Sequence, residues 1–162
     1  MSYTFHLSRG ARSARPYRLI MTHRLILIKM GKHISERFYT YCHVMSSDED
    51  QPIVMDIYVG LTFRDELAIS VDLFDYDEPW YNCSTAAIVN IGDARRMAKH
   101  NKVRYDMLPR FISECMEEWR DVINPNFRQV AECFKEITEC LLDEGCRFRI
   151  ERTYGPGGHI CC

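Results

Sequence analysis

Long apolar runs are missing from this sequence. The longest is Leu25-Ile26-Leu27-Ile28, which Lys29 ends at once, whereas a helix that crosses a bilayer needs roughly 20 apolar residues. The first residues also contain no apolar stretch followed by small residues, the pattern of a secretory signal. We therefore expect no membrane segment, a cytoplasmic setting and eight reduced cysteines.

Signatures of catalysis and of cofactor binding are also scarce. No glycine-rich loop ends in Lys-Ser or Lys-Thr, so the sequence contains no P-loop for nucleotide phosphates. His159, Cys161 and Cys162 carry zinc-ligand chemistry, but adjacent cysteines chelate poorly and no Cys-x-x-Cys pair exists elsewhere. The six histidines are scattered, and none lies in a motif that would pair it, as a base, with a catalytic serine or cysteine. The sequence predicts no catalytic residue, no metal site and no cofactor.

Four cysteines in the second half of the chain allow a different hypothesis, a small metal- or thiol-dependent enzyme. Cys133 and Cys140 are seven residues apart on one predicted helix, where Cys115 and Cys146 can join them. Cysteine is also a common small core residue. We interpret these thiols as core residues and keep the enzyme as the third hypothesis.

Charge is divided unevenly along the chain. The net charge is −2, but the first 35 residues hold seven basic residues and no acid, while residues 36–162 hold 14 basic and 23 acidic residues. Residues 36–162 are therefore acidic, and an acidic surface repels nucleic acid and is complementary to a basic protein surface. The basic N-terminal stretch has the composition of an organellar transit peptide, but we favour a flexible arm or a true start at Met21.

Apolar alternation predicts strands on both sides of a polar loop at 46–52. Two β-rich runs at about 18–30 and 37–45, joined by Gly31-Lys32-His33, predict a hairpin. After the loop, apolar residues at odd-numbered positions predict a three-stranded meander with turns at 64–66 and 75–79. The alternating residues are Ile53, Met55, Ile57, Val59, Leu61, Phe63, Leu67, Ile69, Val71, Leu73, Tyr81, Cys83, Ala87, Val89 and Ile91.

Helical spacing replaces this alternation after residue 91. A short polar helix is expected from about 92 to 101. Apolar residues from Leu108 to Ile123 then predict a helix with Asp106 as its N-cap, ended by Asn124-Pro125. A further helix follows over 127–141, which Gly145 can cap. A last strand is expected where apolar and charged residues alternate from Cys146 to Glu151.

These elements predict an α+β fold with two layers. Its N-terminal antiparallel sheet, a hairpin plus a three-stranded meander, is covered by two main C-terminal helices and completed by a last strand. We expect one domain over 18–154, between a flexible basic arm at 1–17 and a flexible tail at 155–162.

The meander carries a resemblance to a known group of proteins. Ile57-Tyr58-Val59-Gly60, Leu67-Ala68-Ile69, Glu78-Pro79-Trp80 and Val89-Asn90-Ile91 resemble a pattern in small uncharacterised proteins carried on conjugative elements of gut bacteria. The resemblance is confined to residues 57–91. It implies a bacterial, mobile-element origin and a cytoplasmic setting, and it transfers no active site.

The leading functional hypothesis is a non-enzymatic binding protein, such as a mobile-element accessory or inhibitor protein that engages a host macromolecule. Aromatic side chains beside charges are typical of binding hot spots, and such a group falls at the predicted exposed turn. The predicted partner-binding residues are Asp72, Asp75, Asp77, Glu78, Trp80 and Tyr81. A solvated hairpin turn is the plain alternative, and the spacing does not match a calcium loop.

The second hypothesis is a nucleic-acid-binding accessory protein. Arginines in the N-terminal arm alternate with aromatic residues, which together can neutralise phosphates and stack on bases. The residues predicted for this role are Arg9, Arg12, Arg15 and Arg18.

Overall fold

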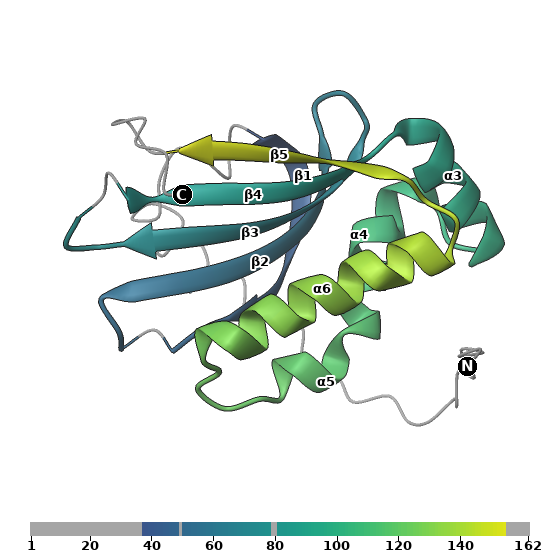
Figure 1. Cartoon of the computed structure of the whole chain (residues 1–162). Coiled ribbons are helices and arrows are strands. Elements are labelled where there is room, and N and C mark those ends of the chain that lie inside the picture. Colours follow the sequence, from purple (N-terminus) through teal and green to yellow (C-terminus); the bar gives the residue numbers. More distant parts are fainter. Residues whose placement is uncertain (1–36, 49, 79–80, 155–162) are drawn as a thin grey trace. The chain divides into compact units, whose positions relative to one another are not determined.

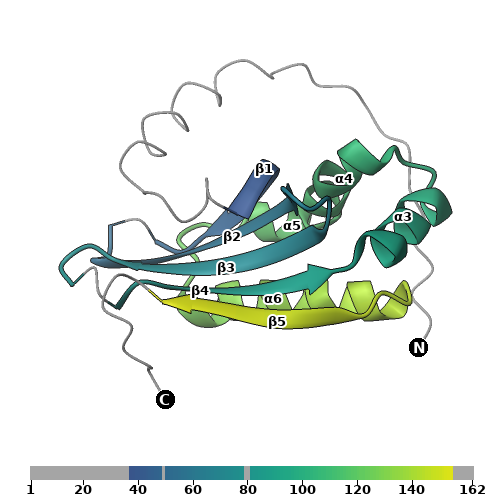
Figure 2. The same ribbon diagram turned by 90° about the horizontal axis from the view of Figure 1, so that it is seen from above.

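A single antiparallel sheet of five strands organises the described part of the chain, residues 37–48, 50–78 and 81–154 of a computed structural model (Figure 1). The strands lie side by side in chain order (Figure 2). They are β1 Phe38–Ser46, β2 Ile53–Thr62, β3 Leu67–Asp75, β4 Cys83–Val89 and β5 Phe148–Tyr154. The first four form a meander, and β5 returns after the helices to pair with β4.

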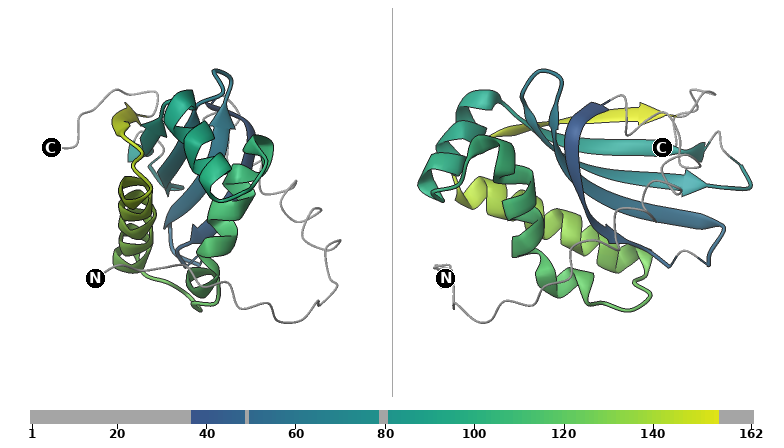
Figure 3. Two further views of the ribbon diagram at one scale, coloured as in Figure 1. Left: turned by 90° about the vertical axis from the view of Figure 1, so that its right-hand side faces the viewer. Right: turned by 180° about the vertical axis from the view of Figure 1, so that it is seen from behind.

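The helices between β4 and β5 form the second layer. They are α3 Ile91–His100, the 3-10 turn η2 Tyr105–Met107, α4 Leu108–Cys115, α5 Glu117–Arg120 and α6 Phe127–Asp143. α4 packs on β1 and β2, and α6 packs on β2 and β3. α3 lies at one end of the sheet (Figure 3). The predicted α+β fold, with a meander under C-terminal helices and a final strand, is confirmed.

The hydrophobic core lies between the sheet and the helices. Val59, Leu61 and Ile69 contribute fully buried side chains from the strands, and Leu108 and Ile137 contribute them from the helices. Successive strand residues point to opposite faces, so the odd-numbered positions of β2 and β3 share the helix-covered face. The prediction that odd-numbered residues of the meander face the core is therefore confirmed in the middle of the sheet, from Ile57 to Leu61 and from Leu67 to Ile69.

Side-chain caps and one glycine set the helix ends. The Asn90 side chain accepts a hydrogen bond from the Asp93 N–H at 3.0 Å and begins α3. Asn126 and Gln129 form a reciprocal capping box at the start of α6. Gly145 follows α6 with a φ of 73°, a left-handed conformation that glycine adopts without strain. Gly145 therefore closes α6 as the sequence predicts.

The single helix predicted from 108 to 123 is wrong in its length. α4 ends at Cys115, Met116 interrupts the helix, and α5 is one short turn. Asp106 is not an N-cap, because it lies inside η2 and its carboxylate accepts two bonds from the Arg104 guanidinium, at 2.8 and 3.1 Å. Apolar spacing continued through the break, so the pattern alone did not reveal it.

Some predicted inward-facing residues are exposed. Phe63 is 68% exposed because β2 ends at Thr62, and Tyr81 is 45% exposed because β4 begins at Cys83. β1 confirms the second run of the predicted hairpin. The first run at 18–30, the arm at 1–17 and the tail at 155–162 lie outside the described residues.

Candidate functional site

Three loops meet at one end of the sheet, which we call the acidic end. They are residues 47–52 between β1 and β2, 76–82 between β3 and β4, and 121–126 between α5 and α6. The Tyr76 N–H donates to the Pro52 carbonyl at 3.0 Å, and the Asp48 N–H donates to the Pro125 carbonyl at 3.1 Å. These two bonds hold the three loops together, opposite the end that carries α3 (Figure 1).

The acidic end has charge of one sign. The three loops contain no Lys, Arg or His. Its described acids, counting the last residue of β3, are Asp48, Asp50, Asp75, Asp77, Glu78 and Asp121. None of them takes part in an ion pair within the described ranges. In sequence, the nearest basic residues to these loops are Arg120 and Arg128, and Arg128 is already paired with Glu132 at 2.9 Å.

Asp75 organises the turn between β3 and β4. Its Oδ1 accepts the backbone N–H of Asp77 at 3.0 Å and of Glu78 at 2.9 Å, and its own N–H donates to the Asn82 side chain at 2.6 Å. The Tyr81 N–H donates to the Glu78 carbonyl at 3.0 Å. The Asp75 and Asn82 side chains thus accept the backbone N–H groups of Asp75, Asp77 and Glu78. The side chains of Asp77 and Glu78 are exposed to solvent.

Large apolar side chains are exposed beside these acids. Tyr76 is 52% exposed, Tyr81 45% and Ile123 87%, and each comes from a loop of the acidic end. Tyrosine supplies a rigid, amphipathic contact at low cost in side-chain entropy, which makes it common in interface hot spots. The acidic end thus combines unpaired negative charge with apolar anchors.

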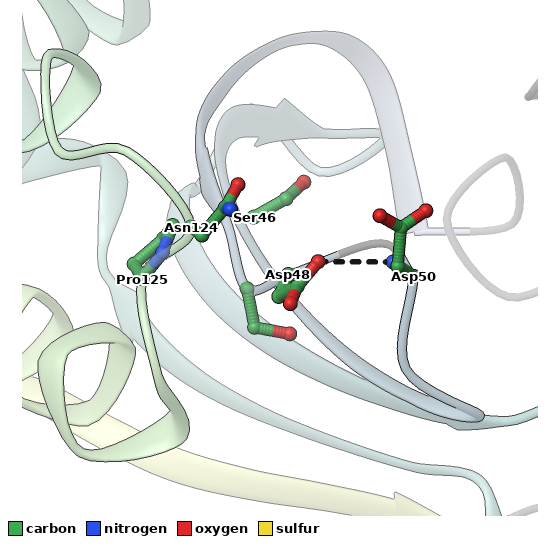
Figure 4. Close-up of a pocket in the computed structure, with 6 residues that line it drawn as sticks. Ser46, Asp48, Asp50, Asn124 and Pro125 are labelled. Atoms are coloured by element: carbon green, nitrogen blue, oxygen red, sulfur yellow. Dashed lines mark hydrogen bonds between the residues drawn. The ribbon is translucent and has the colours of Figure 1, made fainter.

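A shallow polar pocket of about 290 Å³ lies within the acidic end (Figure 4). It is lined by Ser46, Ser47, Asp48, Asp50, Asn124 and Pro125. The Asp50 N–H donates to Asp48 Oδ1 at 3.0 Å across its rim. Its lining offers mainly oxygen acceptors, so it suits a cationic or hydrogen-bond-donating group of a partner.

The predicted partner-binding residues fall into two places. Asp75, Asp77, Glu78 and Tyr81 come together at the acidic end, while Trp80 lies outside the described residues. The placement of Asp72 at an exposed turn is wrong, because β3 continues to Asp75 and Asp72 is only 3% exposed within it. The predicted nucleic-acid residues Arg9, Arg12, Arg15 and Arg18 also lie outside the described residues.

Asp72 belongs to a polar row that crosses the sheet on the face opposite α4 and α6. Each member pairs in register with the next, one from each strand. The row is Ser46, Asp56, Asp72, Ser84 and Thr153. Burial, and next the negative charge of Asp56, raise the pKa of Asp72 to about 6, although the nearby Ser84 hydroxyl and the Arg37 guanidinium lower it. No single sequence pattern indicated this row, since its members come from five separate strands.

The neighbouring His43 does not complete a nucleophile site. Ser46 Oγ donates to Asp56 Oδ1, and His43 Nε2 lies 2.8 Å from the same Ser46 oxygen. In a nucleophilic triad the histidine stands between the hydroxyl and the acid, whereas here the serine stands between histidine and acid. The arrangement therefore lacks the order that activates a serine through histidine.

Two of the described cysteines are buried in the core. Cys133 and Cys146 are 0% and 1% exposed, and burial raises the pKa of Cys133 to about 12. Burial also raises the pKa of Cys115 and of Cys140. Within 37–48, 50–78 and 81–154, no group of three or more His, Cys, Asp or Glu residues could hold a metal ion. These shifts favour the thiol over the thiolate at Cys115, Cys133 and Cys140.

No helix in the described ranges is both long and apolar enough to span a membrane. No family model matches the chain, and comparisons with curated proteins and with solved structures find no match either.

Proposed function

We propose that this chain is a non-enzymatic binding protein that captures a basic protein surface through its acidic end. The observation that carries the proposal is the meeting of three loops that contain no basic residue and that expose Tyr76, Tyr81 and Ile123. Complementary charge steers association and selects partners, while desolvated aromatic anchors supply most of the affinity.

The likeness of residues 57–91 to proteins of conjugative elements supports a more specific role. An accessory protein of a mobile element gains from neutralising a host protein that would act on the element. Host proteins that act on nucleic acid present basic surfaces, which suit a surface with the charge of the acidic end. We therefore propose that the partner is a basic host defence or regulatory protein.

A charge-reversal experiment tests the proposal. The immobilised full chain is used to capture proteins from a bacterial lysate, and each captured protein is then purified and titrated by calorimetry. The test variant carries Asp50→Lys, Asp77→Lys and Glu78→Lys. Its matched control carries Glu132→Lys, Glu139→Lys and Asp143→Lys, which change the net charge equally but lie on α6.

The expected result is a loss of at least tenfold in affinity for a basic partner in the test variant, with near wild-type affinity in the control. All six positions are exposed, so both variants should unfold within a few degrees of the wild type. Equal affinity for every purified partner in the two variants would remove the acidic end as the binding surface.

A further inference from the structure

The end of the sheet opposite the acidic end is rich in basic residues. Residues 94–104, which cover most of α3 and the loop after it, contain no acid. Their basic residues are Arg95, Arg96, Lys99, His100, Lys102 and Arg104, and all six are exposed. α3 forms much of this end in Figures 1 and 3.

The packing of α3 explains why its cations face solvent. Asp93, Ala94, Met97 and Ala98 are its buried residues, which leaves the intervening positions outside. The Arg147 backbone N–H bonds Asp93 Oδ2 at 3.1 Å and holds the pKa of Asp93 below its usual range. Asp93, the one acid of α3, is thus buried, and its Oδ1 also pairs with the Arg96 guanidinium.

Several of the outward cations have no acidic partner. Among the described residues, Lys99 and Lys102 form no ion pair, and neither does Arg64 in the turn between β2 and β3. The Arg95 guanidinium lies 5.5 Å from the centre of the Tyr105 ring, within the range of a cation–π contact. Arg95 and Lys99 are four residues apart, so they share one helix face.

Exposed aromatic rings adjoin these cations. Phe63 and Tyr39 are 68% and 48% exposed, and their ring centres are 6.2 Å apart. The Tyr39 hydroxyl donates to Asp65 Oδ1 at 3.1 Å, and the Tyr105 hydroxyl donates to the Asp65 carbonyl. Asp65 therefore connects the aromatic pair to Tyr105 and, through its ring, to Arg95. We call this surface, from Tyr39 and Phe63 to α3 and Lys102, the basic end.

We propose that the basic end binds single-stranded nucleic acid. Cations that lack acidic partners suit the phosphates, and exposed rings beside them suit stacking by unpaired bases, which is how proteins hold single strands without reading their sequence. A duplex keeps its base faces stacked within the helix, so it would leave Phe63 and Tyr39 without a partner.

The carboxylates of the acidic end do not oppose this binding. β2 joins the two ends and has 10 residues, which at about 3.3 Å per residue separates them by roughly 30 Å. The Debye length at physiological ionic strength is about 8 Å. The carboxylates of the acidic end are therefore screened from a strand bound at α3. This surface is separate from the one in the proposed function and does not depend on it.

The test measures the fluorescence anisotropy of labelled 12-nucleotide single-stranded DNA and RNA with the full chain at several salt concentrations. One variant carries Arg95→Glu, Lys99→Glu and Lys102→Glu, and a second carries Phe63→Ala. A matched control carries Arg120→Glu, Arg128→Glu and Lys135→Glu, which are exposed away from the basic end. A further variant replaces Arg9, Arg12, Arg15 and Arg18 with Ala.

We expect the wild type and the matched control to bind both strands. The slope of log affinity against log salt should become shallower by about 2 in the basic-end variant, since each lost phosphate contact removes about 0.7. Phe63→Ala should weaken binding by roughly five- to a hundredfold, the range for one lost stacking contact.

Three outcomes would overturn the proposal. These are no binding by the wild type, equal binding by the basic-end variant and the matched control, and loss of binding only in the N-terminal arginine variant. Sedimentation with anionic vesicles of mixed phosphatidylserine and phosphatidylcholine, run in parallel, separates nucleic acid from a lipid surface. Vesicle binding without strand binding is a case of the first outcome and would assign the basic end to an anionic lipid surface.

Discussion

Asp56 on β2 lies directly opposite Asp72 on β3, and the two residues are only 1% and 3% exposed. The surroundings of the two carboxylates differ. The Ser46 and Tyr58 hydroxyls both donate to Asp56, whereas Asp72 Oδ1 and Ser70 Oγ have no hydrogen-bond partner in the described part of the chain. Two buried carboxylates in register are costly when both are charged, so Asp72 is the member of the pair whose proton matters for stability.

Asp72→Asn should stabilise the fold at neutral pH. Because burial raises the pKa of Asp72 to about 6 from the usual 3.8, its contribution to stability is full below pH 3.8 and is lost as the pH rises through 6. Asparagine keeps the shape and removes that dependence. We expect a gain of roughly 1–3 kcal/mol at pH 7.5 and little change at pH 3.5. Urea unfolding at pH 3.5, 5, 6 and 7.5 measures the difference.

Asp77→Asn is the control for that series, because Asp77 is exposed in the turn after β3. Its unfolding free energy should track the wild type at every pH within about 0.5 kcal/mol. A stability gain in Asp72→Asn that did not depend on pH would show that shape, and not the buried charge, causes it.

Gly60→Ala should destabilise the protein through a backbone collision. A Cβ at this position on β2 would lie 2.5 Å from the Thr40 carbonyl oxygen and 2.8 Å from the Tyr41 Cβ on β1. Neither atom can move away without separating the two strands. We expect a loss of at least 1–3 kcal/mol, the usual range for overpacking, measured by urea unfolding.

Gly92→Ala provides the contrast. Its added Cβ would meet only the Asn90 side-chain oxygen, at 3.2 Å, and alanine is favoured over glycine in a helix by up to about 1 kcal/mol. The two effects oppose each other, so the net change should stay below 1 kcal/mol. A smaller loss for Gly60→Ala than for Gly92→Ala would contradict the close approach of β1 to β2.

The meander was predictable because β2 and β3 carry an apolar residue at every odd-numbered position from Ile53 to Leu61 and from Leu67 to Leu73. The odd-numbered Ile57, Val59 and Ile69 are buried as their parity requires. The break at Met116 was not predictable, because α4 and α5 keep apolar residues at nearly helical spacing across it. The spacing of apolar residues indicates which side of a helix or strand faces the core. It does not indicate where packing against neighbouring elements interrupts a helix.

The candidate site was only partly predictable for a similar reason. Asp75, Asp77 and Glu78 are contiguous in sequence, so their cluster was visible. Asp50 and Asp121 join them only through the fold, and no periodicity connects residues 71 positions apart. The sequence placed Asp72 at the exposed turn because an aspartate near a turn usually lies at the surface. In the fold it lies within β3, where the polar row across the sheet surrounds it.

The native fold should protect Cys133 and Cys146 from alkylation. Both are buried, and burial raises the pKa of each thiol, so thiolate is scarce at neutral pH. Iodoacetamide at pH 7.5, followed by peptide mass spectrometry, should modify these two cysteines only after addition of urea. Cys115, which is exposed, should react faster than either in the native state. Rapid native modification of Cys133 would contradict its place in the core.

Asn126→Ala should weaken α6 at the point where it leaves the acidic end. The Asn126 side chain accepts the Gln129 N–H at 3.0 Å, and the Gln129 side chain accepts the Asn126 N–H at 2.9 Å. Alanine removes the first bond and leaves an unpaired helix donor, so we expect a loss of about 1 kcal/mol in unfolding free energy. Asn126→Ser restores an acceptor of the preferred kind and should recover most of that loss. Equal losses for alanine and serine would mean that the capping box does not stabilise α6.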